Sequence, residues 1–238
     1  MDETAPLLAA RDIHAGYGSN EVLHGVSMTI APQTIVALLG HNGAGKTTFL
    51  RTVFGLHPMT AGTLQYAGQS LPSGAPQLRV LRGIALVPET RNVFPRMSVL
   101  ENLRFALQAG GGNGAGKDSI AFAFDIFPAL KEKLGQPAGS LSGGQRQMLA
   151  VSLALVKRPK LLLLDEPSLG IAPNLVQRMM ESMRTIRDQI GSGVLLVEQA
   201  VQAALSVADD VYVMRMGKMV TAAPAEEVRR QPDLWRYF

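Results

Sequence analysis

The five residues Asn-Gly-Ala-Gly-Lys occur twice in the chain, at 42–46 and again at 113–117. Glycine-rich runs that end in lysine can cradle phosphate groups. The glycines let backbone N–H groups turn toward an anion, and the lysine supplies a positive charge. The repeat therefore raises two candidate phosphate sites, and the residues around each copy decide between them.

The first copy lies within a complete phosphate-binding pattern. The stretch GHNGAGKT at 40–47 fits G-x-x-x-x-G-K-[S/T] in full, the motif known as Walker A. In this pattern Lys46 reaches the β- and γ-phosphates, and the hydroxyl of Thr47 is a ligand for Mg²⁺. We expect a nucleotide to be bound by Gly40, His41, Asn42, Gly43, Ala44, Gly45, Lys46, Thr47 and Thr48.

The segments around the first copy have the structure that the motif requires. The apolar, β-branched run 34–39 predicts a buried parallel strand. Residues 46–54 predict a helix that ends at Gly55 and directs its positive end at the phosphates. Strand, loop and helix thus follow in the required order.

The second copy lacks this context. Asp118 follows its lysine, so a carboxylate would face the phosphates where the motif needs a hydroxyl. Ser98 and Glu101 have capping-box spacing, so residues 99–108 before this copy predict a helix and not a strand. Five glycines within 110–116 suit a surface connection. We expect Lys117 to make no contact with nucleotide.

A second chemical feature is the acidic pair that ends KRPKLLLLDEP. The run Leu161–Leu164 is bounded by prolines at strand length, so it predicts a buried strand with two acids at its carboxyl end. Ligands bind at that end of the strands in α/β sheets. Asp165 is the candidate Mg²⁺ ligand (Walker B), and Glu166 is the candidate group that orients or deprotonates an attacking water.

The stretch LSGGQRQ at 141–147 predicts a helix start. Ser142 and Gln145 have capping-box spacing, and the helix is expected to run to Lys157. Two glycines in a first turn are unfavourable for a helix, unless backbone N–H groups must approach a ligand closely. Because the first copy already provides this chain's phosphate loop, such a helix start would serve the nucleotide of another chain, or no nucleotide at all.

Walker A, the LSGGQ stretch and Walker B, in this order, resemble the ATP-binding subunit of an ABC transporter over nearly the whole chain. The resemblance implies ATP and Mg²⁺ as cofactors. It also implies a head-to-tail dimer in which each ATP lies between the Walker A loop of one subunit and the LSGGQ stretch of the other. That stretch consists of Leu141, Ser142, Gly143, Gly144 and Gln145.

The resemblance assigns further positions. Tyr17 lies where the family stacks an aromatic ring on adenine, and Gln199 lies where the family usually has a histidine near the γ-phosphate. Glu89 replaces a usual glutamine in the segment that links the ATP site to the membrane subunits. The stretches VPETRNVF, DEPSLGIAP and VEQ are similar to one branch, the ATPases of branched-chain amino-acid and of urea or amide importers. The resemblance thus implies an importer for branched-chain amino acids, with urea or short amides as the alternative solute and a non-transport assembly ATPase of the same fold as the further alternative.

Composition bounds the class of protein. The 238 residues are 47% hydrophobic and 18% charged, and they include no cysteine, so disulfides and thiolate chemistry are excluded. We expect no signal peptide and no membrane span. The net charge is +4, but no run interleaves arginine with aromatic residues, so nucleic acid is not an expected partner.

The expected fold is an α/β P-loop domain over residues 1–238. Residues 1–88 and 156–238 are expected to form a RecA-like core with an antiparallel β part near the N-terminus, and residues 89–155 an inserted helical subdomain. By resemblance, the partners are two membrane permease subunits, a second ATP-binding subunit and an extracytoplasmic solute-binding protein. The implied location is the cytoplasmic face of the inner membrane, as a peripheral subunit.

Overall fold

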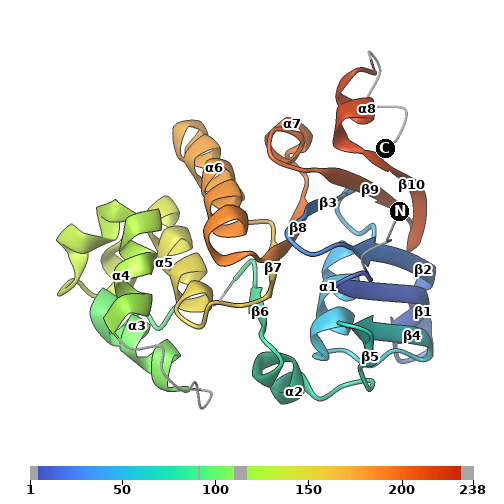
Figure 1. The fold of residues 1–238 in the computed structure, drawn as a ribbon, viewed down its shortest axis with the longest axis horizontal. Coiled ribbons are helices and arrows are strands. Elements are labelled where there is room, and N and C mark those ends of the chain that lie inside the picture. Colours follow the sequence, from blue (N-terminus) through green and yellow to red (C-terminus); the bar gives the residue numbers. More distant parts are fainter. Residues whose placement is uncertain (1–4, 91, 110–116, 232–238) are drawn as a thin grey trace.

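The computed structural model describes residues 5–90, 92–109 and 117–231 (Figure 1). In chain order, the strands are β1 (Leu8–Tyr17), β2 (Asn20–Ile30), β3 (Ile35–Leu39), β4 (Ala61–Tyr66), β5 (Gln69–Ser70), β6 (Ile84–Val87), β7 (Leu161–Asp165), β8 (Gly193–Glu198), β9 (Asp210–Arg215) and β10 (Lys218–Pro224). The α-helices are α1 (Lys46–Phe54), α2 (Pro76–Leu81), α3 (Val99–Gln108), α4 (Lys117–Ile126), α5 (Gly143–Leu155), α6 (Pro173–Ile190), α7 (Val201–Leu205) and α8 (Ala225–Arg229). Two 3₁₀ helices are η1 (Pro128–Lys133) and η2 (Ala138–Ser140).

The strands form two sheets. The smaller sheet has the order β2-β1-β4-β5 and is antiparallel throughout. The larger sheet has the order β10-β9-β3-β8-β7-β6, in which every neighbouring pair is parallel except β10 with β9. This arrangement confirms the expected α/β class with an antiparallel part near the N-terminus.

Alternate residues of the large sheet pack into two separate hydrophobic clusters. Val36 and Leu38 of β3 join α1 and the antiparallel sheet on one face. Ile35 and Leu39 join helices α5, α6 and α7 on the other. Figure 1 shows α1 on the side of the antiparallel sheet, with α6 and α7 across the large sheet from it. Because both faces are covered, β3 and β7 are continuous apolar runs without polar alternation.

The carboxyl ends of three parallel strands meet at one edge of the large sheet. Leu39 at the end of β3 is in register with Glu198 of β8, and Asp165 at the end of β7 is in register with Val197. The loops that follow these strands carry the glycine-lysine motif, the acidic pair and Gln199. Sheet register therefore brings together segments that lie more than 100 residues apart in the sequence.

Helix boundaries follow local capping. Gly55 ends α1 in the left-handed conformation, with φ of 83°, as expected for this position. Complete capping boxes begin α3 at Ser98 and α5 at Ser142, which confirms both expected helix starts. The expected end of α5 at Lys157 is wrong by two residues. The backbone N–H of Arg158 donates to Leu155 and this residue has φ of 46°, which turns the chain toward β7.

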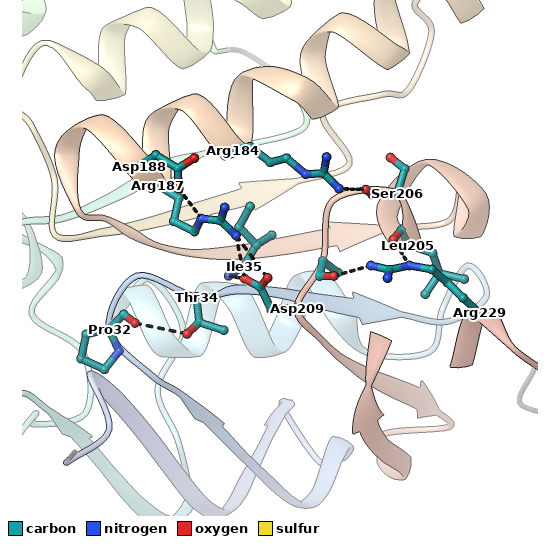
Figure 2. Close-up of polar contacts among 11 residues, drawn as sticks. Pro32, Thr34, Ile35, Arg184, Arg187, Asp188, Leu205, Ser206, Asp209 and Arg229 are labelled. Carbon is teal, nitrogen blue, oxygen red and sulfur yellow. Dashed lines mark hydrogen bonds and ion pairs between the residues drawn. The ribbon is translucent and has the colours of Figure 1, made fainter. Parts of the chain in front are cut away.

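A polar network holds the amino end of β3 against the helices of the opposite layer (Figure 2). The carboxylate of Asp209 accepts the backbone N–H of Ile35 at 2.8 Å and pairs with Arg187 of α6 at 3.1 Å. Arg229 of α8 donates to the carbonyl groups of Leu205 and Ala208, each at 2.8 Å. These contacts fix the start of the strand whose other end carries the phosphate loop.

Within the described ranges, none of the helices has the length and apolar character needed to cross a bilayer. The repeated stretch at 113–116 lies outside the described residues. The side chain of Lys117 also lies outside them, so the expectation for this second copy stays a prediction.

Candidate active site

The loop between β3 and α1 is shaped by glycines with positive φ. The φ values are 78° at Gly43 and 107° at Gly45, a region that other residues rarely adopt. A Cβ atom at Gly40 would lie 2.3 Å from the carbonyl oxygen of Met214, so this position also needs glycine for close approach. The resulting loop leads directly into α1, whose N-terminus is a favourable place for an anion.

Lys46 lies at the bottom of this loop and is only 4% exposed. Its ammonium group donates to the carbonyl oxygens of Gly40 at 2.7 Å and His41 at 3.1 Å. It also lies 3.5 Å from a carboxylate oxygen of Glu166. The loop thus folds around the cation and holds it beside the acidic pair.

Thr47 and Asp165 place two oxygen groups side by side. The hydroxyl of Thr47 donates to the carboxylate of Asp165 at 3.0 Å. Asp165 is 3% exposed, and burial raises the pKa of its carboxyl, while the bond from Thr47 opposes that rise. The described residues contain no group of three or more His, Cys, Asp or Glu side chains arranged for a metal. Two oxygen ligands suit Mg²⁺ that takes its remaining ligands from phosphates and water.

Glu166 is held in a strained conformation next to the lysine. Its φ is 48°, which is unfavourable for a residue other than glycine and is a feature found at functional sites. Its backbone N–H donates to Val197 at 2.9 Å, and its carboxylate accepts the side-chain amide of Gln199. Gln199, expected near the γ-phosphate, therefore donates a hydrogen bond to the carboxylate of Glu166, the candidate catalytic group.

One cavity of about 360 Å³ joins these groups. Its lining residues are Val22, Asn42, Gly43, Ala44, Gly45, Lys46, Thr47, Thr48, Glu89, Glu166, Leu169 and Gln199. The structure thus brings residues 42–48 of the phosphate loop together with Glu89, Glu166 and Gln199, whereas Gly40, His41 and Asp165 are not part of the lining. Sequence reasoning missed Val22 and Leu169, because no motif marks an apolar wall.

Other expected site residues lie outside the lining of this cavity. Tyr17, at the end of β1, is half-exposed, and its ring centroid lies 4.3 Å from that of His57. His57 is itself held by a 2.9 Å hydrogen bond between Nε2 and the carbonyl oxygen of Gly16. The Tyr17 ring is therefore supported on one side.

The LSGGQ stretch also lies outside the lining, at the start of α5. Exposed Ser142 accepts the N–H of Gln145 at 3.3 Å, and its own N–H donates to the Gln145 side chain at 3.1 Å. A Cβ at Gly144 would meet Leu175 of α6 at 2.6 Å, and one at Gly143 would lie 3.2 Å from the carbonyl oxygen of Gly170. Close packing within the chain is thus one reason for these two glycines.

A polar residue that the sequence analysis did not select completes the surroundings of Gln199. Glu198 at the end of β8 is 2% exposed, and its carboxylate accepts both the N–H and the hydroxyl of Ser168, at 2.9 and 2.8 Å. Burial raises the pKa of its carboxyl. The available signal was an acid inside the apolar run GVLLVE.

Sequence comparison finds relatives over almost the full chain. Residues 23–169 match the model of the ABC transporter family. The chain is 43% identical over 219 residues to the high-affinity branched-chain amino acid transport ATP-binding protein BraG of Pseudomonas aeruginosa, covering 90% of this chain and 91% of that protein. It is 36% identical over 222 residues to the probable branched-chain amino acid transport ATP-binding protein LivF of Archaeoglobus fulgidus, covering 93% and 94%.

Solved structures agree on the fold. An ATP-binding subunit of an ABC transporter is 28% identical, with a TM-score of 0.82 over 96% of this chain and 94% of that one. A nucleotide-free ATP-binding cassette from an ABC transporter, 24% identical, gives a TM-score of 0.85 over 98% of both chains and supports the fold alone. With the phosphate loop, the acidic pair and the capped LSGGQ helix in place, this chain belongs to the ABC transporter family, as an ATP-binding subunit of the kind that hydrolyses ATP.

Proposed function

We propose that this chain is the ATP-hydrolysing subunit of a membrane importer for branched-chain amino acids. The observation that carries the chemistry is the cavity in which Lys46, Glu166 and Gln199 meet. The solute class is supported by the branched-chain amino-acid transport names of the relatives at 43% and 36% identity. A urea or amide importer, the alternative from the sequence, becomes an outcome of the test below.

The residues that line the cavity have separate roles in hydrolysis. Backbone N–H groups of the loop and the ammonium of Lys46 bind the β- and γ-phosphates and neutralise their charge. Since Lys46 lies 3.5 Å from Glu166, phosphate binding draws the cation away from this carboxylate. Glu166 then orients the attacking water and accepts its proton, while the amide of Gln199 fixes the position of the carboxylate.

The adjacent oxygens of Thr47 and Asp165 would hold Mg²⁺. The ion would offset negative charge on the phosphates. Glu89 also lines the cavity, and its negative charge adds to the rise in the pKa of Asp165 that burial causes. We infer that Glu89 orients water in the cavity.

The position of the LSGGQ stretch supports the proposal of a second ATP-binding subunit. Ser142 is exposed at a helix start, and the stretch is absent from the lining of the chain's own nucleotide cavity. We infer a head-to-tail dimer in which Leu141, Ser142, Gly143, Gly144 and Gln145 face the ATP of the partner. Tyr17 stacks on the adenine of the chain's own nucleotide, with His57 behind it.

The permease partners have a candidate docking place. A cavity of about 230 Å³ is lined by residues of β6, α3 and α5 and by Pro88, which directly precedes Glu89. It is lined largely by alanine, valine and proline, with Asn92 and Lys157 as its polar groups. Docking of a membrane subunit there would hold the chain as a peripheral subunit at the cytoplasmic face. An extracytoplasmic solute-binding protein would act through those subunits.

The same organisation supports the proposed division of the chain. All described strands lie within residues 1–88 and 156–238, whereas residues 89–155 contribute helices α3, α4 and α5 together with η1 and η2. We infer that residues 89–155 form the helical subdomain that connects the nucleotide site with the membrane subunits.

The test is ATP hydrolysis by the complex of this chain with the membrane subunits that co-purify with it, reconstituted in lipid vesicles. Solute-binding protein loaded with leucine is expected to stimulate hydrolysis and to drive leucine uptake, and Lys46→Ala is expected to remove both. Stimulation by urea or acetamide with no response to leucine would reject the branched-chain assignment. Co-purification without any membrane subunit would reject the transport role.

A further inference from the structure

A single buried carboxylate, that of Glu198, joins the loop that follows Glu166 to the loop that follows β8. Glu198 ends β8 and is 2% exposed. One of its oxygens accepts the backbone N–H of Ser168 at 2.9 Å, and the other accepts the Ser168 hydroxyl at 2.8 Å. The second oxygen also accepts the backbone N–H groups of Gln199 at 3.2 Å and Ala200 at 3.5 Å.

These contacts are unusual for a residue that serves stability alone. Among the ion pairs found within the described ranges, none involves Glu198, so its charge is held by hydrogen bonds without a cation. Taking a carboxylate out of water is unfavourable, and an apolar residue at the end of this strand would avoid that cost. A buried acid without a cation partner, beside a reaction site, is more typical of a functional role.

Both segments that Glu198 holds lead to groups of the site. Gln199, whose N–H it accepts, donates its side-chain amide to Glu166. Ser168 precedes Leu169, which lines the nucleotide cavity, and Gly170, whose carbonyl lies against Gly143 at the start of α5. Glu198 thus contacts both Gln199, the hydrogen-bond partner of Glu166, and the loop that meets the LSGGQ helix.

We propose that Glu198 is a positioning residue for ATP hydrolysis, which fixes Gln199 and the Ser168 loop so that Glu166 is held for attack by water. This role rests on the proposed use of Glu166 in hydrolysis. It predicts an effect on the rate of the chemical step. It predicts no effect on ATP binding, because Glu198 is not among the residues that line the cavity or hold Lys46.

The test compares Glu198→Gln with the parent in the complex with the membrane subunits, measuring basal ATP hydrolysis without solute. The amide keeps the shape but places an N–H₂ group against donors that need an acceptor. We expect kcat to fall by about 10- to 100-fold with KM for ATP within about twofold. Glu181→Gln makes the same chemical change on the exposed face of α6 and is expected to leave both constants unchanged.

Ser168 provides a second set of variants that does not alter the buried acid. Ser168→Ala removes one hydrogen bond and is expected to lower kcat by about 3- to 10-fold, whereas Ser168→Thr keeps the hydroxyl and is expected to stay near the parent. In the double variant Glu198→Gln/Ser168→Ala, the two losses are expected not to multiply, since both remove the same contact.

Unchanged kcat in Glu198→Gln would overturn the proposal. So would a rise in KM that accounts for the whole loss, or equal activity of the Ser168→Ala and Ser168→Thr variants. A lower unfolding temperature with kcat reduced only by the unfolded fraction would assign Glu198 to stability alone. Because the assay contains no solute, a wrong branched-chain assignment would not change these outcomes.

Discussion

The phosphate loop and the start of α5 are both glycine-containing helix N-termini, but their surroundings differ. At the phosphate loop, Lys46 and Glu166 are 4% and 8% exposed and lie 3.5 Å apart. At the start of α5, Ser142 is exposed and forms the hydrogen bonds of its own capping box with Gln145. The first helix start faces a cavity of its own chain, and the second faces outward.

The difference shows that a sequence motif alone does not make a complete binding site. The loop after β3 is completed within the chain, because sheet register brings the ends of β7 and β8 to it. The start of α5 has a complete capping box, yet it lies outside the lining of the candidate site. In the proposed dimer, its ligand is the nucleotide of the partner subunit.

The largest expected effect is that of Glu166→Gln. If Glu166 takes the proton of the attacking water, the amide is expected to lower ATP turnover in the assembled complex by about 100- to 10,000-fold. ATP binding is expected to persist, and a closed dimer to accumulate with ATP. Steady-state rates measure the loss of turnover, and size-exclusion runs with and without ATP measure the accumulation of the dimer. Near-normal hydrolysis by the variant would show that Glu166 is not catalytic.

Lys46→Ala is expected to weaken ATP binding by about 100-fold, because several charge-assisted contacts to the phosphates are lost together. Lys117→Ala is the matched control at the second copy of the repeat and is expected to leave binding unchanged. A nucleotide titration of both purified variants gives the answer. Equal losses in the two variants would make the second copy a phosphate site as well.

Gln199→Ala is expected to slow turnover by about 10- to 100-fold with ATP affinity little changed. The amide that restrains the carboxylate of Glu166 is removed, but no contact of Lys46 is altered. Steady-state rates of the complex measure the effect. A variant as fast as the parent would show that Gln199 has no part in hydrolysis.

The smallest effect is expected from Tyr17→Ala. Loss of an aromatic stack weakens ATP binding by about 2- to 10-fold. Binding of inorganic tripolyphosphate, which has no base, is expected to be unchanged in the same variant. A parallel loss for both ligands would mean that Tyr17 supports the loop and does not contact adenine.

Local chemistry explains which parts of the fold could be read from the sequence. The strand before Gly40, the helix that ends at Gly55 and the capping boxes at Ser98 and Ser142 depend on residues within a few positions of one another. The same signals did not predict the end of α5, because the turn at Arg158 is set by the need to enter β7.

Contacts across strands could not be read in this way. The bonds of Glu198 to Ser168 and of Gln199 to Glu166 join positions about 30 residues apart in the sequence, and they exist only through the register of β7 with β8. The sequence marked Glu166 and Gln199 as candidates, but it could not show that one holds the other.

The contrast between the two helix starts is tested most directly with Ser142→Arg. Two quantities are measured: the Kd of the isolated chain for ATP, and ATP hydrolysis by the complex with its membrane subunits. If the start of α5 serves the nucleotide of another subunit, the Kd stays within about twofold of the parent, while the arginine obstructs the partner's site and hydrolysis is lost. A Kd that weakens as much as hydrolysis falls, or a normal rate in the complex, would contradict the account.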